Sequence, residues 1–305
     1  MTITQLEYII AVDTHRNFNV AAKNCFVSQP TLSMQIQKLE EELGIKLFER
    51  AKQPIVPTPM GVVLLEQARI TLGEFHKIKE LVEEQEQALQ GELRVGIIPT
   101  VSPYILPRIL SPFKQYYPQV KLVIWEQTTD AILQQVKTGQ LDCGIVSAPI
   151  DDAQLVLQEL FSERFIAYIG DPGKREQDER IDPKDINVED LWLLDEGHCM
   201  RDQVLNFCQL RDRHRQPSHY EYKTGSIETL KKMVEENDGI TILPELAILD
   251  LTPAQQDRVR PFTAPEPRRS ICLVTQRSFL KRMLIGALKE QVLAAVEGRL
   301  PADAE

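Results

Sequence analysis

The sequence predicts two folded parts joined by one long helix: a small all-α unit with a β-wing at the N-terminus and a two-lobed α/β body at the C-terminus. Three observations support this. Apolar residues recur at helical spacing over the first sixty residues, a long amphipathic stretch follows, and from Glu92 short β-branched runs alternate with helical stretches. We place the boundaries at 1–58, 59–90 and 91–305, with one lobe at about 91–162 and 268–300 and the other at about 163–267.

The first sixty residues have the pattern of two helices joined by a tight turn. Small and apolar side chains share one face of each: Phe18, Ala21, Ala22 and Cys25 in the first helix, and Leu32, Ile36, Leu39 and Leu43 in the second. Ser28 is placed as the N-cap of the second helix, with Pro30 in its first turn. Its opposite face carries Pro30, Ser33, Met34 and Gln37 and is short and uncharged, which is typical of a helix that reads base edges.

A β-wing is expected after these helices, where Lys46–Arg50 and Ile55–Thr58 flank a turn at Ala51–Pro54. Arg50 and Lys52 would lie near its tip and meet phosphates or a minor groove. The net charge is -10, yet residues 1–60 hold six basic and six acidic side chains, so only this block could face a polyanion. Periodicity alone equally allows a helical core module with no role in DNA binding.

The linker helix begins at Thr58-Pro59 and meets no breaker except Gly73 before Gly91. Its apolar seam consists of Leu65, Ala68, Leu72, Phe75, Ile78, Leu81 and Val82. A helix of about 30 residues is about 45 Å long, too long for one small domain to bury. The seam therefore predicts pairing with a second copy, which would place two reading helices in successive major grooves. The alternative is a lone, solvent-facing spacer.

The C-terminal body has the β-α-β-α order of a parallel sheet. The expected strands are Leu93–Ile98, Val120–Trp125, Leu141–Val146, Phe165–Ile169, Ile240–Leu243 and Ile271–Val274. The expected helices are Ile105–Tyr116, Ala131–Lys137, Arg201–Leu210, Ile227–Val234 and a closing helix from Phe279. Thr100 follows the first strand and Thr129 the second, so their hydroxyls would converge where open α/β sheets bind ligands, here a small anion or metabolite. Each threonine alone also fits an ordinary helix cap.

Cys199 and Cys208 lie nine residues apart in a stretch of helix-forming residues. In a helix they would face opposite ways with a rise of about 13.5 Å, whereas a disulfide needs Cα atoms within ~7 Å. Bond formation would therefore unwind the segment, which describes a two-state switch. His198, Arg201 and a helix start would favour the Cys199 thiolate, which peroxide could oxidise and Cys208 could resolve. The alternative is two unrelated core cysteines, and we interpret Cys25, Cys143 and Cys272 as packing residues.

The N-terminal motifs resemble the winged helix-turn-helix of LysR-type transcriptional regulators, and the body resembles their periplasmic-binding-protein-like effector domain. The motifs are Phe18-x-x-Ala21-Ala22, Ser28-Gln29-Pro30-Thr31-Leu32-Ser33, Lys38-Leu39-Glu40 and Leu47-Phe48-Glu49-Arg50. The resemblance implies base contacts by Gln29, Pro30 and Ser33. It also implies backbone contacts by Thr31, Lys38 and Arg50. Ser28 and Gln37 complete the expected DNA-binding set.

Further motifs resemble the peroxide-sensing members of that family. They are Asp195-Glu196-Gly197-His198-Cys199, Arg201-Asp202-Gln203, Phe207-Cys208, Ile98-Pro99-Thr100-Val101, Gly239-Ile240-Thr241 and Pro265-Glu266-Pro267-Arg268-Arg269. The resemblance implies that Cys199 is the peroxidatic residue and Cys208 the resolving one. The implied peroxide pocket comprises Thr100, Thr129, His198, Arg201, Asp202 and one of Arg268 and Arg269. The segment from Arg211 to Pro217 looks longer and more basic than its counterpart in the family.

The resemblance also implies the partners of the protein. These are double-stranded promoter DNA, RNA polymerase, hydrogen peroxide, a thiol reductant such as glutaredoxin or thioredoxin, and further copies of the chain in a homodimer and a homotetramer. We expect an activator of antioxidant genes that is not an enzyme and needs no cofactor or metal.

A cytoplasmic location without membrane contact is expected, because the first 25 residues lack a secretory pattern and the longest apolar run near the start of a helix, Met60 to Leu65, is far too short to span a bilayer. Two other functions remain open. One is a metabolite-binding regulator with incidental cysteines, and the other is a thiol peroxidase. A peroxidase has no need of a DNA-reading unit, which disfavours the second.

Overall fold

The computed structural model describes residues 1–50, 54–83, 89–174, 180–210, 224–277 and 281–300, and of residues 76–83 and 174 only the backbone. The chain forms two compact units: unit 1, mainly Met1–Ala88, and unit 2, made of Leu89–Val136 and Leu141–Glu305. The boundaries expected for the linker and for the two lobes stay predictions. Lys52 and the segment from Arg211 to Pro217 lie outside the described residues.

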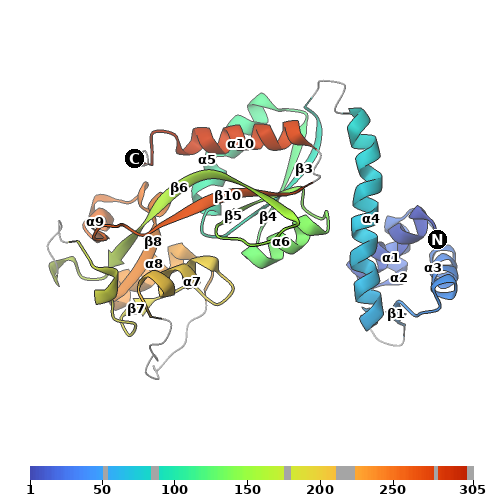
Figure 1. The fold of residues 1–305 in the computed structure, drawn as a ribbon, viewed down its shortest axis with the longest axis horizontal. Helices are drawn as coiled ribbons and strands as arrows, with labels where there is room; N and C mark the ends of the chain where they lie inside the picture. Colours follow the sequence, from blue (N-terminus) through green and yellow to red (C-terminus); the bar gives the residue numbers. More distant parts are fainter. Residues whose placement is uncertain (51–53, 84–88, 175–179, 211–223, 278–280, 301–305) are drawn as a thin grey trace. The chain divides into compact units, whose positions relative to one another are not determined.

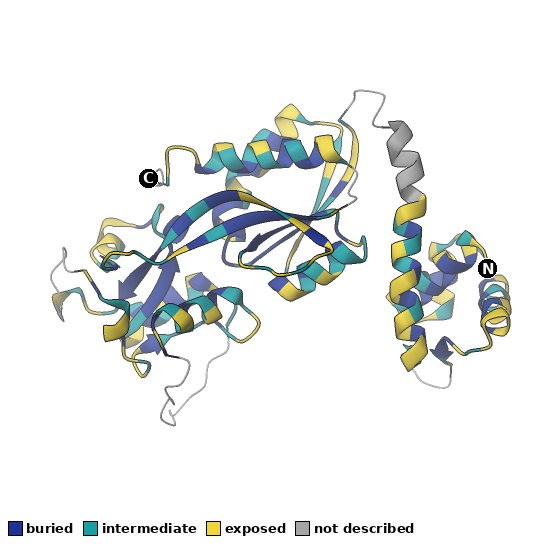
Figure 2. Ribbon diagram, in the orientation of Figure 1, coloured by how far each residue is buried: buried dark blue, intermediate teal, exposed yellow. Residues whose placement is uncertain are grey.

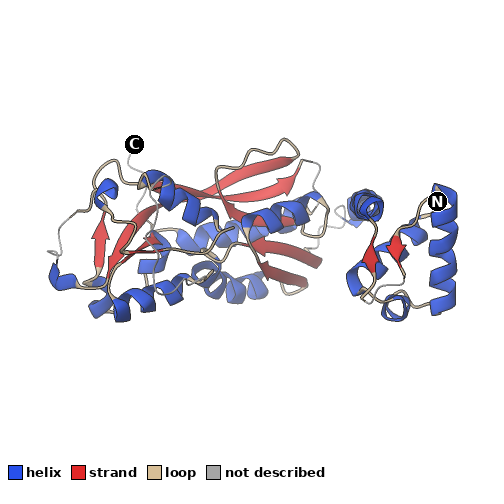
Figure 3. Cartoon of the chain, turned by 90° about the horizontal axis from the view of Figure 1, so that it is seen from below, coloured by secondary structure: helices blue, strands red, loops and turns tan. Residues whose placement is uncertain are grey.

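Unit 1 is the predicted winged helix-turn-helix with a long helix after it. Its elements are α1 (Ile3–His15), α2 (Phe18–Asn24), α3 (Gln29–Leu43), β1 (Phe48–Glu49), β2 (Val56–Pro57) and α4 (Pro59–Glu83). The Ser28 hydroxyl accepts a hydrogen bond from the Thr31 amide and caps α3, as expected. Figure 3 shows the two short strands of the wing beside these helices; Phe48 pairs with Pro57 and Glu49 with Val56 in antiparallel register.

The core of unit 1 uses the predicted helix faces with one exception. Leu32, Ile36 and Leu39 are fully buried. Leu43 is exposed instead, because α3 ends there and Gly44, in the left-handed conformation at φ 69°, turns the chain away. The periodicity of the helix face was therefore correct up to the residue at which the helix stops.

The first part of the apolar seam of α4 packs within unit 1, and pairing of this helix with a second copy stays a prediction. Leu65, Ala68 and Leu72 are at most 8% exposed and belong to the same core as α1 (Figure 2). Arg69 on this helix also donates to Asp13 of α1 at 2.6 Å. A stripe of apolar residues along a helix indicates that this face is buried but not what covers it. The side chains of Ile78, Leu81 and Val82 lie outside the described residues.

Unit 2 is built on one mixed sheet with the strand order β4-β3-β5-β10-β6-β8-β7, and β9 pairs with β6. The strands are β3 (Gly91–Ile97), β4 (Val120–Glu126), β5 (Cys143–Ser147), β6 (Leu155–Ile169), β7 (Leu191–Trp192), β8 (Ile240–Pro244), β9 (Val259–Pro261) and β10 (Arg268–Gln276). Strands β3, β4 and β5 are parallel, as predicted. The expectation of a wholly parallel sheet is wrong, because β10 runs antiparallel to both β5 and β6.

This antiparallel pairing comes from the path of the chain. It leaves the first lobe along the long strand β6 and returns along β10, so the two strands run in opposite directions side by side (Figure 1). The sequence predicted only the Phe165–Ile169 end of β6, which begins ten residues earlier at Leu155. The start of β6 pairs with β10 and its end pairs with β8 and β9, so a single strand connects the two halves of the sheet.

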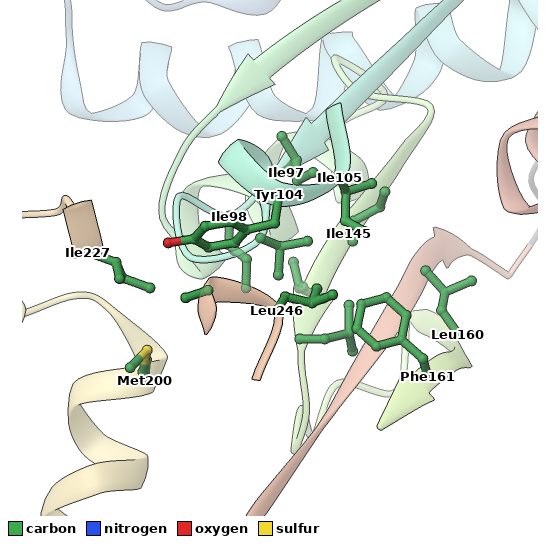
Figure 4. Close-up of a cluster of buried hydrophobic side chains, with 14 of the residues drawn as sticks. Ile97, Ile98, Tyr104, Ile105, Ile145, Leu160, Phe161, Met200, Ile227 and Leu246 are labelled. Carbon is green, nitrogen blue, oxygen red and sulfur yellow. The ribbon is translucent and has the colours of Figure 1, made fainter. Parts of the chain in front are cut away.

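Helices and short 3-10 turns lie along this sheet. They are α5 (Ser102–Tyr116), α6 (Thr129–Lys137), α7 (Cys199–Phe207), α8 (Ile227–Asn237), α9 (Pro253–Gln256) and α10 (Arg282–Val296), with short 3-10 turns η2 (Pro172–Lys174), η3 (Pro183–Asp185) and η4 (Glu245–Ile248). Figure 4 shows Met200 of α7, Ile227 of α8 and Leu246 of η4 beside a cluster that includes Ile98 and Tyr104. The helix with the two cysteines thus packs into the central core of unit 2.

Candidate functional site

Helix α7 starts at Cys199 and is followed directly by Cys208, its C-cap residue. Cys199 is half-buried at the helix start, whereas Cys208 is completely buried. Nine helical steps separate the two by about 13.5 Å along the axis, and neither forms a disulfide in the described structure. The predicted helical arrangement is therefore confirmed: the two thiols lie at opposite ends of one short helix.

The environment of Cys208 keeps its thiol protonated. Desolvation by burial raises the pKa of Cys208 to about 12. The neighbouring Phe207 ring packs against Phe165 and Phe262, with centroid distances of 5.1 and 5.8 Å. Cys208 cannot act as a nucleophile in this conformation, because the thiolate is the reactive form.

His198 is the N-cap residue of α7, and its charge differs from the expectation. Desolvation by burial lowers its pKa, although Asp195 and Glu126 oppose the shift, so the imidazole is neutral at pH 7. It therefore adds no positive charge beside Cys199, which corrects the prediction that it favours the thiolate electrostatically. Its ring lies against the backbone of Gly225, where an added Cβ would come within 2.8 Å of Nε2.

Arg201 and Asp202 occupy the first turn of α7 but point to different surroundings. The Arg201 guanidinium donates from Nη1 to the carbonyl of Leu194 at 2.9 Å, in the loop before the helix. Asp202 is exposed to solvent. Asp202 thus lies at the surface rather than among the buried threonines with which the pocket prediction grouped it.

Thr100 is held by a buried ion pair that the sequence did not reveal. Arg269 donates from Nη1 to the Thr100 hydroxyl at 2.9 Å and from Nη2 to the Thr100 carbonyl at 3.2 Å. The same guanidinium binds Oε1 of Glu163 through Nε at 2.9 Å and Nη2 at 2.8 Å, and both side chains are fully buried. Arg268 is exposed and donates to Ser162 at 3.1 Å. Of the two candidate arginines, Arg269 is the one beside Thr100.

Three buried polar atoms, one just after β4, one at the start of α6 and one in the middle of α7, have no hydrogen-bond partner within the described part of the chain. They are Oε1 of Gln127, the hydroxyl of Thr129 and Oε1 of Gln203. The loop before α7 reaches this region, since a Cβ at Gly197 would lie 3.9 Å from Thr128. Buried polar atoms are normally paired, so these three leave hydrogen-bonding capacity for a small polar molecule.

Gln203 also connects α7 to the end of β5, a contact that sequence reasoning missed. Its Nε2 donates to the Ser147 hydroxyl at 3.0 Å and to the Ala148 carbonyl at 2.8 Å. Glu163 was missed too. Glu163 lies in the run Leu160–Ile169, which is mostly apolar, but Ser162 and Arg164 flank it directly, so the signal of a buried partner was weak.

The predicted DNA-binding residues gather at α3 and the wing. Ser28, Pro30, Thr31, Gln37, Lys38 and Arg50 are exposed, and Gln29 and Ser33 are half-buried. Gln37 donates to Glu41 at 2.9 Å, and the hydroxyls of Ser28 and Thr31 are 2.8 Å apart. The uncharged outward face expected for a reading helix is therefore present on α3.

Arg50 is anchored rather than extended from the wing. Its Nη1 donates to Ser33 at 3.3 Å, its Nη2 binds Glu40 at 3.1 Å, and its guanidinium stacks 5.2 Å from the Phe18 ring centroid. Glu40 is fully buried and also accepts from the Leu47 amide at 2.8 Å. Glu40, which the sequence analysis named in a family motif without a role, thus fixes the wing against the reading helix.

The chain belongs to the LysR family of bacterial transcriptional regulators. Residues 3–62 match the bacterial regulatory helix-turn-helix of the lysR family, and residues 86–297 match the LysR substrate binding domain. The fold therefore defines a class of protein in which a DNA-reading unit is followed by a sensing unit.

Within that family the chain is similar to proteins named for hydrogen peroxide. It is 38% identical over 274 residues to the "Hydrogen peroxide-inducible genes activator" of Haemophilus influenzae, covering 90% of each chain. It is 37% identical over 302 residues to the "DNA-binding transcriptional dual regulator OxyR" of Escherichia coli, covering 98% of this chain and 97% of the relative.

Solved OxyR structures have the same fold. A full-length OxyR variant from Pseudomonas aeruginosa superposes with a TM-score of 0.80 at 34% identity, covering 96% of this chain and 98% of that one. A Corynebacterium glutamicum OxyR variant described as H2O2-bound gives a TM-score of 0.60 at 28% identity, with 96% and 92% of the chains covered.

Neither a metal centre nor a bilayer-crossing segment occurs among the described residues. No three His, Cys, Asp or Glu side chains in this part of the chain gather as ligands for one ion. None of its helices combines the length and the hydrophobicity that crossing a bilayer requires.

Proposed function

We propose that this protein is a DNA-binding transcriptional regulator that senses hydrogen peroxide through Cys199 and Cys208 and controls antioxidant genes. The observation that carries the proposal is α7, a short helix with a partly accessible thiol at its start and a buried thiol just past its end. The names of the relatives, which refer to peroxide and to gene activation, support the same function.

The chemistry proceeds in two balanced steps. The Cys199 thiolate attacks one peroxide oxygen; the S–O bond forms, the O–O bond breaks, and the leaving oxygen takes a proton and departs as water. The Cys208 thiol then attacks the sulfenic acid sulfur, so that the S–S bond forms and a second water leaves. Peroxide receives two electrons in total. An external thiol reductant such as glutaredoxin or thioredoxin returns them through exchange with the disulfide.

The second step requires a conformational change. Cys208 is buried, and its pKa of about 12 leaves it protonated while α7 is intact. The separation of about 13.5 Å along the axis exceeds the ~7 Å between Cα atoms that a disulfide allows. Oxidation therefore unwinds α7, which couples the chemistry to the shape of unit 2.

Thr100 is the residue best prepared to orient the peroxide. Because its oxygen accepts a hydrogen bond from Arg269, its own proton remains available to donate to a peroxide oxygen. Thr129 is buried with an unused hydroxyl, and neutral His198 lies at the start of α7, so both fit the same pocket. The positive charge of Arg269 behind Thr100 would stabilise the oxygen that leaves.

Unit 1 would bring this signal to promoter DNA. Gln29, Pro30 and Ser33 at the start of α3 are proposed to contact bases, with Thr31 and Lys38 against the backbone. We propose that the chain acts in the cytoplasm as a homodimer and homotetramer and engages RNA polymerase. Since Leu65, Ala68 and Leu72 are buried within unit 1, self-association would use other surfaces of α4 or of unit 2.

Thiol mapping by mass spectrometry after one equivalent of hydrogen peroxide tests the proposal. We expect a Cys199–Cys208 disulfide within seconds, with Cys25, Cys143 and Cys272 still reduced. The Cys199→Ser variant is the matched control and should bind DNA but ignore peroxide. Slow or scattered oxidation would reject the peroxide switch and favour a small-molecule effector bound in unit 2.

A further inference from the structure

Phe26 lies in the turn between α2 and the reading helix α3, in a conformation that normally selects glycine. Its φ is 56°, in the left-handed region. The Phe26 amide donates to the Lys23 carbonyl at 3.2 Å and the Val27 amide to the Ala22 carbonyl at 3.0 Å. This pair of bonds defines a helix C-terminal motif whose left-handed position is usually glycine, because a Cβ is strained there.

The described residues of unit 1 do not cover the Phe26 ring. The side chain of Phe26 is 96% exposed, the highest value among the large apolar residues in the described part of the chain. An aromatic ring in water gains no burial, and the backbone strain adds to the cost. Strained positions of this kind concentrate at functional sites, where a binding partner uses the side chain.

The position of Phe26 identifies the partner. It lies two residues before Ser28, the N-cap of α3, and three before Gln29. In helix-turn-helix proteins the N-terminal residues of the reading helix enter the major groove, so a ring beside that terminus approaches the same groove. The apolar group that the major groove displays is the C5-methyl of thymine, which phenylalanine is able to contact.

We propose that Phe26 is a specificity-determining residue whose ring contacts the C5-methyl group of a thymine in each half of the DNA site. The inference rests on the DNA-reading role proposed for unit 1 and adds a contact that the uncharged polar residues of α3 do not make. The cation Lys23, exposed near the end of α2, is the side chain of this turn suited to phosphate.

Uracil substitution tests the contact, because uracil differs from thymine only in lacking the methyl group. A duplex is first selected from a random pool with the wild-type full-length protein, and each thymine is then replaced by deoxyuridine. We expect one symmetry-related pair of replacements to weaken wild-type binding about 15-fold, or about 4-fold per methyl group. The Phe26→Gly variant should bind the thymine duplex about as weakly as the wild type binds the uracil duplex and should no longer distinguish them.

Two further measurements separate recognition from folding. Phe26→Gly relieves the backbone strain, so its melting temperature should equal or exceed that of the wild type while its DNA affinity falls. Phe26→Leu keeps an apolar side chain and should retain part of the sensitivity to uracil. Uracil sensitivity that is absent from the wild type, or unchanged in Phe26→Gly, would overturn the methyl contact while leaving DNA binding intact. Failure of the wild type to select any duplex would instead reject the DNA-reading role itself.

Discussion

Replacing Glu163 with glutamine should destabilise unit 2 by about 3–5 kcal/mol, the usual cost of removing one partner from a buried ion pair. Oε1 of Glu163 accepts both hydrogen bonds from Arg269, and Oε2 accepts from the Leu246 amide at 2.9 Å. Glutamine has one oxygen and one NH2 group, so either the Arg269 guanidinium or the Leu246 amide would face the NH2 group, which is itself a donor. The guanidinium would also lose its counter-charge in a site with no exposed surface.

Urea denaturation followed by tryptophan fluorescence measures this loss in unit 2 alone, because the two tryptophans of the chain, Trp125 and Trp192, both lie there. With a slope of about 2–3 kcal/mol per molar urea, the midpoint should fall by about 1–2 M. Arg268→Gln is the matched control. This neighbouring arginine is exposed, so its removal should change stability by less than about 0.5 kcal/mol.

The double variant Glu163→Leu/Arg269→Met shows whether the lost charge balance is the cause. Removing both charges eliminates the unpaired guanidinium, so the double variant should be more stable than Glu163→Gln. A Glu163→Gln midpoint within about 0.2 M of the wild type would refute the reasoning, because it would mean that the ion pair contributes almost nothing. A double variant that loses as much stability as Glu163→Leu and Arg269→Met lose in sum would also refute it.

Three other changes test the sensing helix. Cys208→Ser should stop oxidation at the Cys199 sulfenic acid, which dimedone traps; a rapid disulfide with another cysteine would contradict this. Burial lowers the pKa of His198, so the unfolded state binds its proton first and stability falls as the pH drops below about 6.5. His198→Gln should therefore flatten the decline in urea midpoint between pH 7.5 and pH 5, and an unchanged decline would assign it to other groups. Gln203→Met removes two hydrogen bonds worth about 1 kcal/mol each. The equilibrium of the protein with glutathione should therefore move at least about 10-fold toward the disulfide. An unmoved equilibrium would show that the Gln203 contact does not hold the reduced state.

The helix-turn-helix of unit 1 was predictable because the sequence signals for its helices are local. The N-cap Ser28, the proline two residues later and the apolar stripe of α3 all lie within about four turns of one helix. Local signals did not show what covers an apolar face. The stripe through Leu65 and Leu72 predicted a buried face, but α1 covers it, and no periodicity distinguishes packing within one chain from packing between two.

The sheet and the pocket depended on contacts too distant in sequence for this reasoning. Arg269 and Glu163 are 106 residues apart, and they meet because β6 and β10 are antiparallel neighbours. The direction of a strand cannot be read from its residues, since parallel and antiparallel strands share the same β-branched runs. Choosing between Arg268 and Arg269 required that register, because neighbouring residues of a strand face opposite ways.

Helix α7 has the stability that a reversible switch needs. It is nine residues long, and isolated helices shorter than about 12 residues are marginal in water. Its cap residue His198 makes no side-chain capping bond within the described structure, so α7 depends on tertiary contacts: the buried Met200 and Val204, the Gln203 bonds to β5 and the packing of Phe207. None of these contacts contributes to the hydrogen-bonded strand ladder of unit 2. Under the proposed switch, unwinding α7 would release Cys208 without opening the sheet, and the rate of disulfide formation would depend on how often those few contacts break.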